Sequence, residues 1–266
     1  YALFYGAILI MIFYNLITYF FMRDSSYLYY SLTITAIFWT TASANGIAFQ
    51  IVYPNSFWLQ NEGFLLRGGL IALFIHLFLK KFLLINRREN RRIYNILQIN
   101  IYISLIFILL SFFGNYRLLY FPFISFVIFA FCFIILAGIV RLNQGYRPAR
   151  FYLLAFSGFS LGGLVQSLSL VGLIPPFWIV SHGFQIGNLF QTVFLAFALG
   201  DKFKRLQEDA LEREIEARRV MTSFATKLEE QVRERTKELA EKNERLKEYD
   251  FAVAHDLANP IGVAIT

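Results

Sequence analysis

The fold is decided by residues 151–200, which read FYLLAFSGFSLGGLVQSLSLVGLIPPFWIVSHGFQIGNLFQTVFLAFALG and contain no Asp, Glu, Lys or Arg. A helix that crosses the hydrocarbon core of a bilayer needs about 20 consecutive, mostly apolar residues. The pair Pro175-Pro176 divides this stretch, and a helix does not continue through such a pair. The sequence therefore predicts two membrane-spanning helices, over residues 151–174 and 177–200, joined by a tight turn.

Upstream of this stretch, five further apolar segments are long enough to span a bilayer. They cover residues 2–22, 27–52, 63–85, 93–113 and 118–140. The composition agrees, because 57% of the residues are hydrophobic and 16% are charged, whereas soluble domains carry about 25% charged residues. We therefore expect an all-α fold whose first domain, residues 1–200, is a seven-helix transmembrane bundle in contact with membrane lipid.

The loops between these segments predict the orientation. Eight arginines follow the first, third and fifth segments, whereas Arg117 alone lies on the other side; the eight are Arg23, Arg87, Arg88, Arg91, Arg92, Arg141, Arg147 and Arg150. Because positive loops stay in the cytoplasm, we expect the N-terminus outside and the C-terminus inside. The sequence pI near 9.5 arises from these loops, so it does not indicate binding of nucleic acid.

Several polar residues interrupt the apolar segments, namely Asn15, Arg67, His76, Asn100, Gln166, His182, Gln185, Asn188 and Gln191. Ionisable groups at membrane depth are costly and often functional. Arg67 and His182 lie at similar depths, so one hypothesis places both at an outward-opening cavity. The alternative is that these side chains hydrogen-bond between helices and hold the bundle together. The spacings Gly158-x-x-x-Gly162 and Gly183-x-x-x-Gly187 are typical of closely packed helices.

The composition changes abruptly at Asp201. Residues 201–250 contain 14 acidic and 13 basic residues, and no Pro or Gly occurs before Asn259. Apolar residues recur every seventh position, at Leu211, Ala225, Val232, Leu239, Leu246 and Val253, with Arg218 as the exception. This period predicts a cytoplasmic coiled-coil linker over residues 201–248 that forms a parallel homodimer. A solitary charged helix is the alternative.

A motif follows in residues 248–261, which read EYDFAVAHDLANPI. It resembles the phosphoacceptor box of histidine kinases, in which a helical His is followed by an acid and, four residues after the His, by Thr, Ser or Asn and then Pro. His255, Asp256 and Asn259 occupy these places, although Ala258 replaces the usual basic residue. The resemblance implies that His255 is the nucleophile, that Asp256 orients it and that Asn259 assists. Residues 249–266 would then begin the dimerisation and phosphoacceptor domain.

The membrane half resembles the bacterial seven-transmembrane receptors with diverse intracellular signalling modules. The resemblance rests on Tyr14-Asn15, on residues 23–30 (RDSSYLYY), on residues 45–50 (NGIAFQ) and on Trp58. It implies an inner-membrane location, an extracellular ligand domain upstream of Tyr1 and a signalling module after the last span. The box at His255 selects the kinase branch among those modules.

Together these features predict a membrane-bound sensor histidine kinase that passes phosphate from His255 to a response regulator. We expect no cofactor or metal in this chain, because ATP and Mg²⁺ belong to a catalytic domain that we expect beyond Thr266. Without that domain the fragment would be inactive alone. A seven-helix transporter, a channel or a non-kinase receptor with an oligomerising coiled coil is the alternative. A retinal pigment is excluded, since residues 177–200 contain no Lys for a Schiff base.

Overall fold

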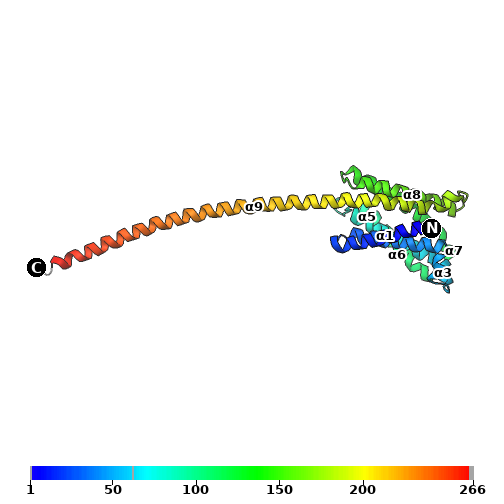
Figure 1. Ribbon diagram of the computed structural model, residues 1–266, viewed down its shortest axis with the longest axis horizontal. Coiled ribbons are helices and arrows are strands. Elements are labelled where there is room, and N and C mark those ends of the chain that lie inside the picture. Colours follow the sequence, from blue (N-terminus) through cyan, green and yellow to red (C-terminus); the bar gives the residue numbers. More distant parts are fainter. Residues whose placement is uncertain (1, 62, 264–266) are drawn as a thin grey trace. The chain divides into compact units, whose positions relative to one another are not determined.

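The computed structural model describes residues 2–61 and 63–263, with the side chains of residues 2, 57, 61, 181 and 256–263 left aside. These ranges contain helices and no strand (Figure 1). The helices are α1 (Ala2–Met22), α2 (Ser25–Ala44), α3 (Ile47–Ile51), α4 (Phe57–Asn61), α5 (Gly63–Phe82), α6 (Arg91–Phe113), α7 (Tyr116–Asn143), α8 (Ala149–Leu170) and α9 (Trp178–Val263). The prediction of an all-α fold is confirmed.

The chain forms two compact units, which divide between Lys202 and Phe203. The first unit contains α1 to α8 and the start of α9, and it is the helical bundle. The second unit is the remainder of α9, whose helical assignment runs unbroken from Trp178 to Val263.

Six helices in the described ranges are long and apolar enough to cross a membrane: α1, α5, α6, α7, α8 and α9. The seventh long helix of the bundle, α2, falls short because it is rich in Ser and Thr. Its hydroxyl groups are nevertheless paired within the helix: those of Thr33, Thr35, Thr40 and Thr41 each donate to the carbonyl four residues earlier, at 2.7–2.8 Å. Such pairing makes these hydroxyl groups compatible with an apolar surrounding. Six spans are therefore found in the described ranges against the seven predicted, and α2 is the difference.

The prediction of one helix over residues 27–52 is wrong. Helix α2 ends at Ala44, and Gly46 takes a left-handed conformation with φ of 75° before α3 begins. A residue with a Cβ adopts this conformation only with strain, so glycine at this place permits the chain to turn. The short helices α3 and α4 then connect α2 to α5.

The centre of the bundle is aromatic. Phe78 stacks on Phe82 with ring centroids 5.2 Å apart, Phe82 stacks on Tyr152 at 5.8 Å, and Tyr152 contacts Phe156 at 4.5 Å. These rings join α5 to α8 and are fully buried. Large apolar side chains also cover the outside of the bundle, among them Phe13, Phe20, Leu109, Phe113 and Phe129. Helices that are apolar both inside and outside the fold are typical of a bundle in lipid.

Helices α8 and α9 are antiparallel neighbours, separated at Pro175-Pro176 as predicted. Their backbones approach closely at glycines. A Cβ atom at Gly162 would collide with the carbonyl of Gly183, and one at Gly187 would lie 2.6 Å from the carbonyl of Gly158. No Cβ fits at Gly162 or Gly187 unless the facing backbone moves, which agrees with the interpretation of the two glycine pairs as packing sites.

Candidate functional site

The arginine-rich loops meet at one end of the bundle. In the loop between α7 and α8, the Gln144 side-chain amide donates to Asn90 Oδ1 at 2.6 Å, and Arg141 donates to Gln144 at 2.8 Å. Asn90 immediately precedes α6. The Tyr146 hydroxyl donates to the carbonyl of Phe82, at the end of α5, at 2.9 Å. These contacts place the arginines of both loops at the same end.

Lys202 lies at this end and is buried, with 8% of its side chain exposed. Its ammonium group donates to Asp24 Oδ2 at 2.5 Å and to Ser26 Oγ at 2.8 Å. It also lies 5.6 Å from the centre of the Phe82 ring, over the ring face. Lys202 is the last residue of the first unit. Its side chain thus connects α9 to the start of α2 and to the end of α5.

Asp24 serves two partners at once. Its Oδ1 accepts from the backbone N–H of Ser26 at 2.9 Å, which caps the N-terminus of α2. Its Oδ2 accepts from Lys202. Burial raises the pKa of the Asp24 carboxyl, but hydrogen bonds from Lys202 and Ser26 and the charge of Lys202 outweigh burial, so that pKa lies below its ordinary value of 3.8. Asp24 is therefore a carboxylate at neutral pH, matched to the charge of Lys202.

A weaker contact lies beside this one. Arg150, at the start of α8, lies 3.5 Å from Asp201 with 55% of its side chain exposed. An exposed pair of this length adds little stability, so Lys202 and Asp24 carry most of the polar attachment of α9 here. Sequence reasoning did not select these two residues. Asp24 had two signals: it is one of three acids before residue 201, and it lies in residues 23–30, which carry the family resemblance. Neither signal indicated Lys202 as its partner.

His255 lies in the second unit, in α9, and its side chain is exposed. Val253, two residues earlier, belongs to the seven-residue apolar series, and two residues correspond to a rotation of about 200° around a helix. His255 therefore faces away from that series. Asp256 and Asn259 lie within the helical bounds of α9, but their side chains fall outside the described residues, so their roles stay predictions.

The structure does not bring Arg67 and His182 to a shared cavity. Arg67, 4% exposed, donates to the carbonyls of Leu59 and Gln60 at the end of α4 and lies over the Trp39 ring at 5.9 Å. His182 stacks on Trp178, one turn earlier in α9, with ring centroids 4.9 Å apart. Arg67 therefore holds a connecting segment against α5, whereas His182 packs along its own helix.

His76 is fully buried in α5. Its Nδ1 lies 2.5 Å from the carbonyl of Ala72, and its ring lies beside those of Phe126 and Phe133, with centroids 6.5 and 6.2 Å away. These contacts join α5 to α7. Packing between helices is thus the role that the structure supports for His76.

Comparison with known proteins adds one match. The family described as 7TM diverse intracellular signalling matches residues 1–202. No curated protein and no solved structure matches the chain significantly. The family match ends at Lys202, which is also the last residue of the first compact unit. Because the match covers more than half of the chain, the protein belongs to the 7TM diverse intracellular signalling family, and its helical bundle is a multi-pass membrane sensor for signalling.

Proposed function

We propose that this protein is the sensing part of a two-component histidine kinase in which His255 accepts the phosphoryl group. The observation that carries the proposal is the position of His255: it is exposed, and it lies in a His-Asp-Leu-Ala-Asn-Pro motif on the helix that also belongs to the membrane sensor. A His-Asp pair on the surface of a soluble protein would not share a helix with a membrane sensor.

The path from sensor to His255 is a single helix. His255 follows Lys202 by 53 residues, and both belong to α9. Helices transmit rotation and translation along their axis when no Pro or Gly interrupts them, and α9 has neither between Gly200 and Asn259. A movement of α9 at the membrane would therefore reach the residues around His255.

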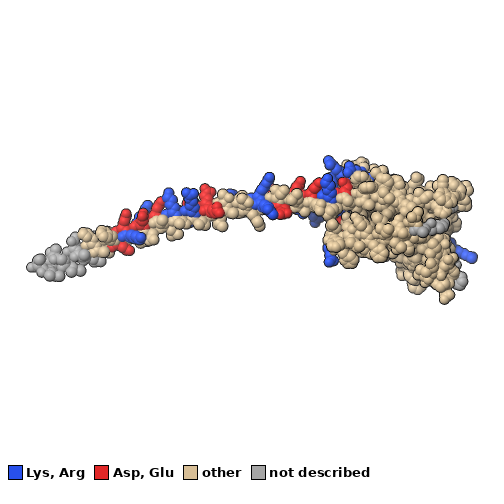
Figure 2. Space-filling model, viewed as in Figure 1, with Lys and Arg blue, Asp and Glu red and all other residues tan. Residues whose placement is uncertain are grey.

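The apolar series of the second unit supports a homodimer. Leu239 is 68% exposed in the single chain, and Leu211, Val232 and Leu246 are also exposed. Figure 2 shows charged side chains mostly along one side of this part of α9, with other residues along the opposite side. A seven-residue apolar stripe that lacks a partner is buried by pairing with a second copy in parallel, which would set two His255 side chains at the same level.

The chemistry follows from the properties of imidazole. One ring nitrogen of His255 attacks the γ-phosphorus of ATP, the bond to the bridging oxygen breaks, and ADP leaves. Asp256 accepts the hydrogen bond from the other ring nitrogen and thereby fixes the tautomer. ATP and Mg²⁺ would be held by a separate catalytic domain, and an aspartate of a response regulator would then receive the phosphoryl group. The arginine-rich end of the bundle would face the cytoplasm, where ATP is available.

The test uses the natural full-length protein in membranes, supplied with ATP labelled in the γ-phosphate. We expect label that is lost in acid and retained in base, as a phosphohistidine requires, and we expect His255→Gln to abolish it without loss of helicity. Glu248→Gln, an exposed change on the same helix, should keep the label. Label that survives acid, or that remains in His255→Gln, would contradict the proposal.

A further inference from the structure

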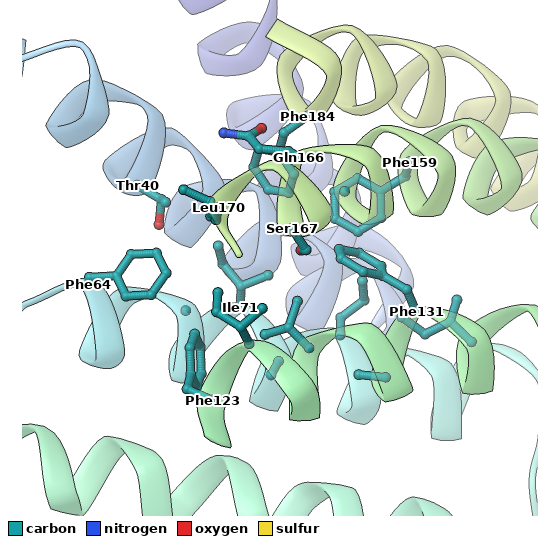
Figure 3. Close-up of a pocket in the computed structure, with 18 residues that line it drawn as sticks. Thr40, Phe64, Ile71, Phe123, Phe131, Phe159, Gln166, Ser167, Leu170 and Phe184 are labelled. Atoms are coloured by element: carbon teal, nitrogen blue, oxygen red, sulfur yellow. The ribbon is translucent and has the colours of Figure 1, made fainter. Parts of the chain in front are cut away.

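The bundle contains a half-open cavity of about 140 Å³ among α2, α5, α7, α8 and α9 (Figure 3). Protein interiors are packed closely, with few voids larger than a water molecule. A cavity of about 150 Å³ with an apolar lining stays dry and holds a benzene molecule. The space in this bundle therefore suits a ligand that contains one six-membered ring.

The walls of the cavity are largely aromatic, with side chains from four helices: Phe64, Phe123, Phe131, Phe159 and Phe184. Two of these rings rest against glycines. A Cβ atom at Gly163 would collide with the Phe131 ring, and one at Gly68 would collide with the Phe123 ring. Because these rings lie against glycine backbone, they leave the centre of the cavity open. Aromatic walls favour an aromatic ligand through edge-to-face and stacked contacts.

Three polar side chains line the cavity, those of Thr40, Gln166 and Ser167. Ser167 of α8 is buried, its hydroxyl turns into the cavity (Figure 3), and it makes no hydrogen bond within the described part of the chain. Its neighbour Gln166 has a buried Oε1 without a hydrogen-bond partner. Thr40, by contrast, already donates its hydroxyl to the carbonyl of Ala36. Buried polar groups are costly when unpaired, so Ser167 marks the place for a polar group of a ligand.

We propose that this cavity binds a phenol-sized aromatic alcohol, with its ring among the phenylalanines and its hydroxyl at Ser167. A hydroxyl both donates and accepts, so it pairs with a serine. Such a molecule also enters a bilayer readily, because most of its surface is apolar. A lipid acyl chain offers no group for Ser167, and water gains few partners from phenylalanine walls.

The bound ring would contact α9 through Phe184. This part rests on the proposed function, because α9 is the helix that contains His255. Occupancy of the cavity would then bias the position of α9 and so the kinase. The binding itself does not depend on phosphorylation, and it is tested separately.

The test measures binding of phenol and of toluene to the full chain in lipid nanodiscs, with empty nanodiscs subtracted. We expect phenol to bind more tightly than toluene. Ser167→Ala should weaken the binding of phenol about three- to tenfold, which corresponds to the loss of one neutral hydrogen bond. The same substitution should leave the binding of toluene unchanged. Ser157→Ala, an exposed serine on the same helix, should change neither ligand.

A second variant removes the space. Ala130 lines the cavity from α7, and Ala130→Leu should abolish binding of both ligands while thermal unfolding shows that the bundle remains folded. The proposal is overturned if protein-containing nanodiscs take up no more phenol than empty ones, or if Ser167→Ala leaves the preference for phenol intact. It is also overturned if native mass spectrometry shows a lipid that co-purifies with the wild type and is lost from Ala130→Leu.

Discussion

Lys202 shows what one side chain contributes at the end of the membrane sensor. It is buried, it has a carboxylate and a hydroxyl as partners, and it lies beside an aromatic ring. Hydrogen bonds to charged groups contribute about 1.5–3 kcal/mol, more than neutral ones. Because Asp24 also caps α2, loss of Lys202 would leave a half-buried carboxylate with one partner fewer.

We predict that Lys202→Met lowers the stability of the bundle by about 1–3 kcal/mol, measured as a lower thermal unfolding temperature in detergent. Lys204→Met is the matched control. Lys204 forms only an exposed contact with Glu208 at 3.8 Å, and such pairs contribute about 0.3–0.5 kcal/mol. Equal effects of the two substitutions would show that the Lys202 contact contributes no stability.

The same contact gives a dependence on pH. The pKa of folded Asp24 lies below its ordinary value of 3.8, so the stabilisation is complete above that value and is lost as the pH falls through the folded pKa. Lys202→Met should therefore show a smaller loss of stability below about pH 4 than the wild type does. Parallel acid profiles for the two proteins would contradict this assignment.

At the scale of elements, sequence patterns located most helices but not their breaks. The division of residues 151–200 at Pro175-Pro176 followed from the missing N–H and fixed φ of proline, and the structure confirms it. The break at Asn45-Gly46 was missed because the apolar residues continue past it, although such a dipeptide favours a turn. The contact of Lys202 with Asp24 joins residues 178 positions apart, and no periodicity reveals a pairing of that kind. The cavity likewise depends on five helices together.

The apolar series of α9 gives a prediction at the same scale. Leu239→Asp would bury two unpaired carboxylates in the proposed dimer. Each costs more than the roughly 1–3 kcal/mol of a neutral unpaired group, so the dimer should dissociate at least about 30-fold more readily. Light scattering of the full chain in detergent measures the effect. Ser223→Asp introduces the same charge on the opposite side of the helix and should leave the dimer intact. A monomeric wild type would contradict the homodimer.

At the scale of the whole molecule, the arginines set the orientation. Side-chain hydrogen bonds gather the loops after α1, α5 and α7 at one end, whereas Arg117 lies at the start of α7 at the other end. With Cys132 replaced by Ala, Arg88→Cys should label with an impermeant thiol reagent only after cells are opened. Asn115→Cys should label in intact cells. The reverse pattern would invert the proposed topology.

The attachment at Lys202 also has a consequence for how such proteins evolve. Both partners of Lys202 lie in the first unit, and Lys202 is the last residue of that unit and of the family match. A recombination event after this residue would leave the whole attachment behind intact. We therefore expect that a different output helix in phase with α9 can follow Lys202 while every contact of Lys202 in the membrane part is kept.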